Sequence, residues 1–156
     1  MIEGTIPGLG HLRLEHLVLD FTGTLSVDGK ILPGINEKLT GLSQSLAIHV
    51  LTADTFGTAK TELAGIPCEV RVIKGKKLDV QKAEYVKKLG TENVVAFGNG
   101  VNDRKMLKVV RLGIAVTGGE GCAVETLFAA HIHVTSIADG LDLLLHPKRL
   151  SATLRF

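Results

Sequence analysis

Short apolar runs rich in Val and Ile alternate along the chain with segments in which apolar residues recur at helical spacing. The runs predict strands, and their near-continuous hydrophobicity is typical of parallel strands that are covered on both faces. We expect these strands at Leu12–Phe21, Leu46–Thr52, Cys68–Ile73, Asn93–Gly98, Leu112–Thr117 and His131–Thr135.

The segments between the runs predict helices. Apolar residues at helical spacing occur at Ile35, Leu39, Leu42 and Leu46, at Ala83, Val86 and Leu89, at Met106, Leu107 and Val110, and at Leu141, Leu144 and Leu145. Asn102 or Asp103 could cap the third of these helices, and Pro147 is expected to start a short terminal helix. The alternation of strand and helix predicts βαβ units, and therefore an α/β fold with a mainly parallel central sheet and helices on both faces, a three-layer Rossmann-like arrangement.

Two further segments predict short hairpins. Residues 25–32 read as two short strands around the turn at Asp28-Gly29. Residues 1–7 predict an extra strand at an edge of the structure. Because no linker, repeat or low-complexity segment interrupts the pattern, we expect residues 1–156 to form a single domain.

Composition narrows the function classes. Hydrophobic residues make up 45% of the 156 residues and charged residues 22%, as in folded globular proteins. The formal net charge of +2 is too small to indicate nucleic acid or a membrane surface as a partner. No apolar stretch approaches the roughly 20 residues that span a bilayer, and the first residues do not resemble a signal peptide. We therefore expect a cytoplasmic protein, with Cys68 and Cys122 as reduced thiols.

Polar residues follow three of the predicted strands at their carboxyl ends, where ligand sites of parallel sheets lie. Asp20 ends the first strand, Thr52 ends the second, and Asn99 and Asp103 follow the fourth. A lysine-rich segment, residues 74–82, follows the third. Carboxylates, a hydroxyl and an ammonium group in one crevice suit a phosphate group together with Mg²⁺.

Each of these residues taken alone has a commoner interpretation. An Asp or Thr at the end of a strand is usually a turn or capping residue, and a single Lys is usually a solvated surface charge. His131 and His133 would share one face of a strand, which leaves a zinc site as an alternative to ordinary surface histidines. The case for phosphate chemistry therefore depends on the occurrence of all the residues in a fixed order.

That order resembles the haloacid dehalogenase superfamily, and most closely the phosphorylation domain of P-type ATPases and the group often called soluble P-type ATPases. The resemblance runs from about Val18 to about Ala115. Four segments carry it: Asp-Phe-Thr-Gly-Thr-Leu from Asp20, Leu-Thr-Ala-Asp from Leu51, Gln-Lys at Gln81 and Lys82, and Gly-Asn-Gly-Val-Asn-Asp from Gly98.

The resemblance implies a magnesium-dependent phosphohydrolase that acts on a small phosphorylated substrate. Asp20 would be the nucleophile that forms an aspartyl-phosphate, and Thr22, by its backbone carbonyl, would bind Mg²⁺ beside it. Lys82 would neutralise charge on the phosphoryl group. Further roles are implied at three positions: phosphate binding by Thr52 and the amide of Ala53, and completion of the metal site by Asn99 and Asp103.

Two departures from the pattern matter. Thr22 stands where phosphatases of the superfamily usually carry a second Asp as general acid and base, which implies slow hydrolysis of the phosphoenzyme, because such a catalyst contributes ~10²–10⁴ in rate. Asn99 stands where the pattern usually has Asp, which implies weaker Mg²⁺ binding. An alternative is therefore a phospho-acceptor or regulatory protein that scarcely turns over, and another is a decayed oligomerisation module.

The spacing of the motifs leaves no room for a cap domain between Asp20 and Thr52 or between Thr52 and Lys82. The segment at residues 25–32 is similar to the flap of the tetrameric sugar-phosphate phosphatases of the superfamily. This resemblance implies an open site and a homo-oligomer, either a dimer or a tetramer.

Overall fold

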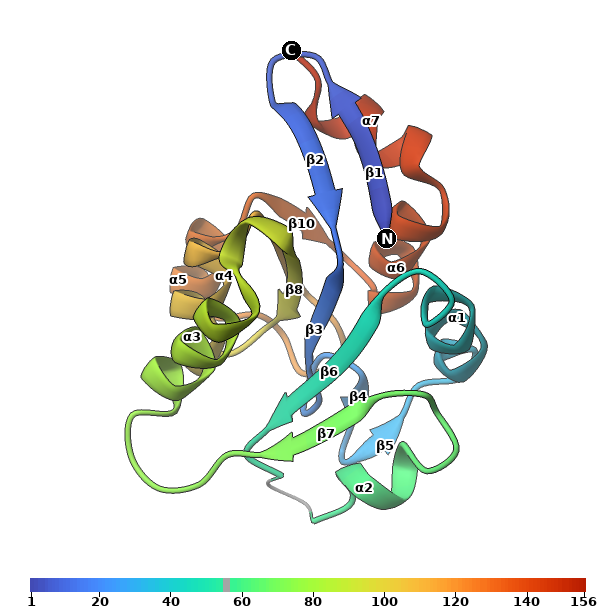
Figure 1. Cartoon of the computed structure of the whole chain (residues 1–156). Helices are drawn as coiled ribbons and strands as arrows, with labels where there is room; N and C mark the ends of the chain where they lie inside the picture. The colour runs from blue at the N-terminus through green and yellow to red at the C-terminus, as the bar shows by residue number, and fades with distance from the viewer. Residues whose placement is uncertain (55–56) are drawn as a thin grey trace.

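The computed structural model describes residues 1–54 and 57–156, and its centre is a six-stranded sheet (Figure 1). Along the sheet the order is β10 (Ile132–Val134), β9 (Leu112–Val116), β8 (Val94–Gly98), β3 (His16–Asp20), β6 (Ala47–Thr52) and β7 (Glu69–Val72). Every neighbouring pair is parallel. The predicted α/β fold is therefore confirmed, and β3 lies inside the sheet between β8 and β6.

Helices cover both faces of this sheet (Figure 1). One face carries α1 (Ile35–Leu42) and α6 (Ile137–Leu145), and the other carries α3 (Leu78–Leu89), α4 (Arg104–Val109) and α5 (Val124–Ala129). The remaining helical elements are short or peripheral: α2 (Ala59–Glu62), α7 (Pro147–Leu154) and the 3-10 turns η1 (Thr91–Asn93) and η2 (Val101–Asp103). Over residues 1–54 and 57–156, no helix is both long and apolar enough to cross a bilayer.

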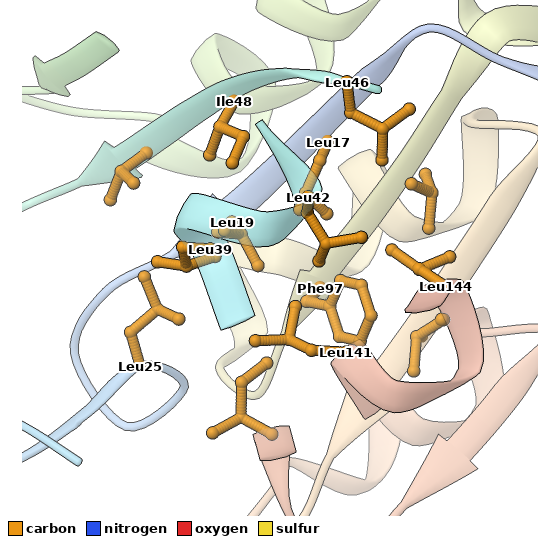
Figure 2. Close-up of a cluster of buried hydrophobic side chains, with 14 of the residues drawn as sticks. Leu17, Leu19, Leu25, Leu39, Leu42, Leu46, Ile48, Phe97, Leu141 and Leu144 are labelled. Atoms are coloured by element: carbon orange, nitrogen blue, oxygen red, sulfur yellow. The ribbon is translucent and has the colours of Figure 1, made fainter. Parts of the chain in front are cut away.

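Side chains of β3 alternate between two hydrophobic clusters. Leu17 and Leu19 pack with the residues of α1 and α6, among them Leu39 and Leu141 (Figure 2). Val18 packs on the opposite face with the cluster that includes residues of α3 and α4. Because successive side chains of a strand point to opposite faces, the strand's last residue shares the face of Val18 and is directed toward α3.

Two antiparallel hairpins extend this core. β1 (Ile2–Ile6) pairs with β2 (Gly10–Leu14), as the predicted extra strand requires, and β4 (Ser26–Val27) pairs with β5 (Lys30–Ile31) around the predicted turn. The second hairpin is the flap, residues 25–32. The elements between β3 and β6 are the flap and α1, and the described part between β6 and α3 holds α2 and β7, so these stretches contain no cap domain.

The prediction of a single strand at Leu12–Phe21 is wrong, because the structure has two strands there, separated at Glu15. Up to residue 14 the chain pairs antiparallel with β1. At Glu15 the partners change: its N–H donates to the carbonyl of Asn93, and its carbonyl accepts the N–H of Ala47. From His16 onward the chain is a parallel strand of the central sheet.

The other predicted strands are correctly located but one or two residues too long. The helix predicted to include Leu46 ends at Leu42. Leu46 is nevertheless buried in the same cluster, because a tight turn follows the helix and the N–H of Leu46 donates to the carbonyl of Leu42. The helical spacing of apolar residues therefore extends to Leu46, one turn beyond the end of α1.

Candidate active site

A buried ion-pair cluster lies at the carboxyl end of β3. The ammonium Nζ of Lys82 is 2.7 Å from Oδ1 of Asp20 and 2.6 Å from Oδ1 of Asp103. All three residues are buried, with exposed fractions of 5% for Asp20, 1% for Lys82 and 0% for Asp103. Such a cluster requires full pairing, since an unpaired charge in the protein interior costs several kcal/mol. The structure thus brings three of the predicted site residues into direct contact.

Lys82 reaches this position because it lies on the inward face of α3. Ala83 and Val86 of the same helix are buried against the sheet, and Val86 follows Lys82 by one turn. The methylene stem of Lys82 is therefore covered while its ammonium group reaches the end of β3. The orientation of α3 that buries Ala83 and Val86 is therefore the same orientation that directs Lys82 toward Asp20.

The cluster perturbs the ionisation of its members. Burial, together with the nearby carboxylate of Asp103, raises the pKa of Asp20 to about 7 against the opposing effect of Lys82. Burial disfavours the charged form of Lys82, but the attraction of Asp103 and Asp20 outweighs it and raises the pKa of Lys82 above its usual range. The three side chains carry one more negative charge than positive, so a cation close to Asp20 would favour its ionised form.

Asp103 is fixed by the loop that follows β8. Its Oδ2 accepts the backbone N–H groups of Asn99 and Gly100, at 3.0 and 2.9 Å, while its Oδ1 accepts from Lys82. Asp103 therefore stabilises this loop. Its side chain does not cap α4, although the sequence predicts it as a candidate for that cap. Gly98 is required beside it, because a Cβ at position 98 would lie 2.5 Å from Cβ and Cγ of Asp103.

A polar cavity of about 200 Å³ opens above this cluster. The residues that line it are Asp20, Thr22, Ala53, Asn99, Gly100, Asn102 and Glu120. Four of them were predicted as site residues: Asp20, Thr22, Ala53 and Asn99. The other predicted residues, Lys82, Asp103 and Thr52, are buried and do not line the cavity.

Glu120 was not predicted as a site residue. It lies in the loop between β9 and α5, which also follows the carboxyl end of a parallel strand. The available signal was an acidic residue among glycines, Gly118-Gly119-Glu120-Gly121, which is separated from the apolar run 112–116 by Thr117 alone.

The oxygen atoms around the cavity fit a magnesium ion. The hydroxyl of Thr24 lies 3.1 Å from Oδ2 of Asp20 and 3.2 Å from Oδ1 of Asn99, so these two oxygens are close neighbours. The buried hydroxyl of Thr22 has no hydrogen-bond partner among the described residues. Mg²⁺ prefers oxygen ligands and keeps several waters, so one carboxylate with amide, carbonyl and water oxygens can hold it.

The end of β6 supplies the other predicted phosphate contacts. The hydroxyl of Thr52 accepts the N–H of Asp54 at 2.8 Å, which leaves the hydroxyl proton free to donate. Asp54 has a left-handed backbone conformation, with a φ of 50°, and its carboxylate accepts the N–H of Ala59 at the start of α2. This turn places Ala53 at the wall of the cavity.

The structure does not support the zinc alternative at His131 and His133. Only His133 belongs to β10, and its ring bonds to the hydroxyl of Thr117. The ring of His131 accepts the N–H of Gly113. In the described ranges, no three His, Cys, Asp or Glu side chains are grouped as metal ligands.

Comparisons with known proteins find a family model and relatives that this chain resembles. The family model described as haloacid dehalogenase-like hydrolase matches residues 74–138. An uncharacterised protein of Methanocaldococcus jannaschii is 42% identical over 80 residues, which are 49% of this chain and 86% of that protein. A probable copper-exporting P-type ATPase of Archaeoglobus fulgidus is 37% identical over 82 residues, 52% of this chain but only 10% of the ATPase.

Solved structures show the same fold. The crystal structure of 3-deoxy-D-manno-octulosonate 8-phosphate phosphatase from Moraxella catarrhalis, in complex with magnesium, phosphate and the sugar acid, superposes with a TM-score of 0.70. It is 17% identical and covers 91% of this chain and 94% of its own.

Proposed function

Because this chain belongs to the haloacid dehalogenase-like hydrolases, we propose that it is a magnesium-dependent phosphohydrolase that transfers the phosphoryl group of a small phosphate ester or acyl phosphate to Asp20. The observation that carries this proposal is the position of Asp20 at the floor of a polar cavity, bound by Lys82. The M. catarrhalis phosphatase, with bound magnesium and phosphate, supports the substrate class and the metal.

The first half of the reaction requires an ionised, correctly oriented nucleophile. The ammonium of Lys82 and the hydroxyl of Thr24 hold the two oxygens of Asp20 from different sides. This arrangement limits rotation of the carboxylate, which favours in-line attack on phosphorus. Attack forms a bond between Asp20 and phosphorus, and the leaving group departs with the electron pair of the broken bond.

The phosphoryl oxygens need positive or hydrogen-bonding neighbours throughout the transfer. The amide of Ala53 and the hydroxyl of Thr52 can donate to them from the end of β6, and Lys82 supplies a fixed positive charge. Asp20, the carbonyl of Thr22 and the side chain of Asn99 would hold Mg²⁺. When bound, the metal would neutralise charge on the transferring group.

Hydrolysis of p-nitrophenyl phosphate with and without Mg²⁺ tests the proposal. Asp20→Asn should abolish turnover, because an amide is no nucleophile, while the fold is kept. Asp142→Asn is the matched control, since Asp142 pairs with Lys38 between α6 and α1, outside the cavity, and should leave turnover unchanged. Turnover in Asp20→Asn close to that of the unaltered protein would contradict the assignment of the nucleophile.

One observation favours a second candidate. Thr22 carries a hydroxyl where an acid or base is expected, and a hydroxyl neither donates nor accepts a proton readily at neutral pH. The protein could then accept a phosphoryl group and keep it, as a regulatory phospho-acceptor. Acetyl phosphate would in that case label Asp20 stoichiometrically, with no release of phosphate over hours.

The expected homo-oligomer is a separate proposal. The flap hairpin and the open cavity support it, since a neighbouring subunit could shield the site. Light scattering during size-exclusion chromatography distinguishes a monomer from a dimer or a tetramer.

A further inference from the structure

Glu120 lies at the cavity in a loop that is fixed at several points. A tight turn joins the N–H of Gly121 to the carbonyl of Gly118 at 3.0 Å. The side-chain amide of Asn99 donates to the carbonyl of Gly121 at 3.0 Å, and the N–H of Ala123 donates to the carbonyl of Asn99 at 2.8 Å. The loop is thus bound directly to the residue that follows β8.

Asp20 and Glu120 occupy different levels of the same cavity. Asp20 is 5% exposed and contacts the buried Lys82, so it forms the floor. Glu120 is exposed to solvent, so it belongs to the rim. In an in-line displacement the entering and leaving groups lie on opposite sides of phosphorus. For a phosphoryl group attached to Asp20 at the floor, the opposite side is the rim, where water enters.

Apart from Glu120, the residues at the rim of the cavity offer no efficient base for the activation of water. Thr22 cannot serve as an efficient base, and Asn99, Gly100 and Asn102 carry no titratable side chain. Of the residues that line the cavity, Asp20 and Glu120 are the two carboxylates. Within the described part of the chain, the Glu120 carboxylate makes no ion pair or side-chain hydrogen bond, so it is free to accept a proton.

We propose that Glu120 is the general base that activates water for hydrolysis of the Asp20 phosphoenzyme, and this inference rests on the proposed function. A water molecule at the rim forms a bond from its oxygen to phosphorus and gives one proton to the Glu120 carboxylate. The bond between phosphorus and Asp20 breaks, and its electron pair returns to the Asp20 carboxylate. Inorganic phosphate leaves, and Glu120 then releases its proton to solvent.

The test separates the two halves of the reaction. The protein is labelled with radioactive acetyl phosphate and Mg²⁺, then chased with unlabelled acetyl phosphate, and the decay of acid-stable protein label is followed. Glu120→Gln should reach the same initial labelling as the unaltered protein, and its phosphoenzyme should persist ~100-fold longer, within the range for loss of a general base. Glu92→Gln is the matched control, because Glu92 is an exposed carboxylate in η1, at the amino-terminal end of β8, and its label should decay at the normal rate.

Three results would overturn the inference. Equal decay in Glu120→Gln and the unaltered protein would show that Glu120 takes no part in hydrolysis. Weaker labelling of Glu120→Gln that high Mg²⁺ restores, with a normal decay rate, would assign Glu120 to metal binding. Absence of label in both the unaltered protein and Glu120→Gln, together with no release of phosphate, would reject the proposed function itself, and the base with it.

Discussion

The ammonium nitrogen of Lys82 lies 2.7 Å from a carboxylate oxygen of Asp20, although 62 positions separate the two residues along the chain. This contact joins α3 to the end of β3, and the second contact of Lys82, with Asp103, adds the segment after β8. The ion-pair cluster of the candidate site is therefore also a structural junction, and we expect changes to its members to affect stability and activity together.

Lys82→Met should lower the free energy of unfolding by about 3–5 kcal/mol, because it leaves two adjacent buried carboxylates without a counter-charge. Urea unfolding measures the change. Lys87→Met is the matched control in the same helix. Lys87 is half-exposed and pairs with Glu84 at the surface, so its loss should cost less than about 1 kcal/mol. Equal effects of the two substitutions would contradict the buried cluster.

Gly98→Ala should displace Asp103, because the added Cβ would lie 2.5 Å from its Cβ and Cγ. We expect a loss of about 1–3 kcal/mol in stability together with slower phosphoenzyme formation. Gly41→Ala is the comparison, since the nearest atom to a Cβ there is a methyl of Leu145 at 3.7 Å, and helix propensity predicts a gain of up to about 1 kcal/mol. Denaturant unfolding and labelling with acetyl phosphate distinguish the two variants.

Thr22→Asp should raise turnover at least ~10-fold, because it places an acid–base group next to the nucleophile. The gain should be larger for alkyl phosphates, whose leaving groups need a proton, than for p-nitrophenyl phosphate. Thr22→Asn is the matched control, with the same shape as Asp but no titratable group. The assay is phosphate release from both substrates. Equal rates in the two variants would mean that position 22 does not limit the reaction.

Stability should fall as the pH is lowered below about 6.5, because of His49. Burial, with the nearby His16 ring, lowers the pKa of His49, whose ring also bonds to the hydroxyl of Tyr85. The folded state therefore resists protonation that the unfolded chain accepts, so this stability is present above pH 6.5 and is lost as the pH falls toward the folded pKa.

Urea unfolding at pH 8 and pH 5.5 measures that loss. His49→Gln should reduce the difference between the two pH values. His146→Gln, at an exposed histidine, should leave the difference unchanged. Some dependence should remain in His49→Gln, because burial and Arg111 also lower the pKa of His131. A pH dependence that His49→Gln does not alter would contradict the role of the buried ring.

The sequence predicted those parts of the fold that local pattern determines. The apolar runs located the six strands of the sheet, and the Asp28-Gly29 turn located the flap. The break at Glu15 was missed, because it follows from a change of hydrogen-bond partners that no local property of residues 12–21 records. The short helices α2 and α5 were also missed. The four residues of α2 are too few for a helical period to be recognised, and α5 buries only Thr126, so no buried apolar period marks it.

The residues of the candidate site likewise fall into those that the sequence predicts and those that it does not. Asp20, Lys82 and Asp103 were found from ordered motifs, and the structure brings them into contact. Glu120 was missed although its loop follows the carboxyl end of β9, because nothing in residues 117–123 indicates that the loop turns back to bind Asn99. Proximity of that kind depends on the packing of two loops and is visible only in three dimensions.

The central place of β3 has a consequence for synthesis of the protein. Its two neighbours are β6 and β8, so the strand made early in translation pairs on its second edge only with residues 94–97. A ribosome-bound chain that stops short of these residues leaves a hydrophobic strand edge open, which is a template for pairing with other chains. The proposed nucleophile, Asp20, therefore acquires its complete surroundings only after residues 94–103 have been synthesised.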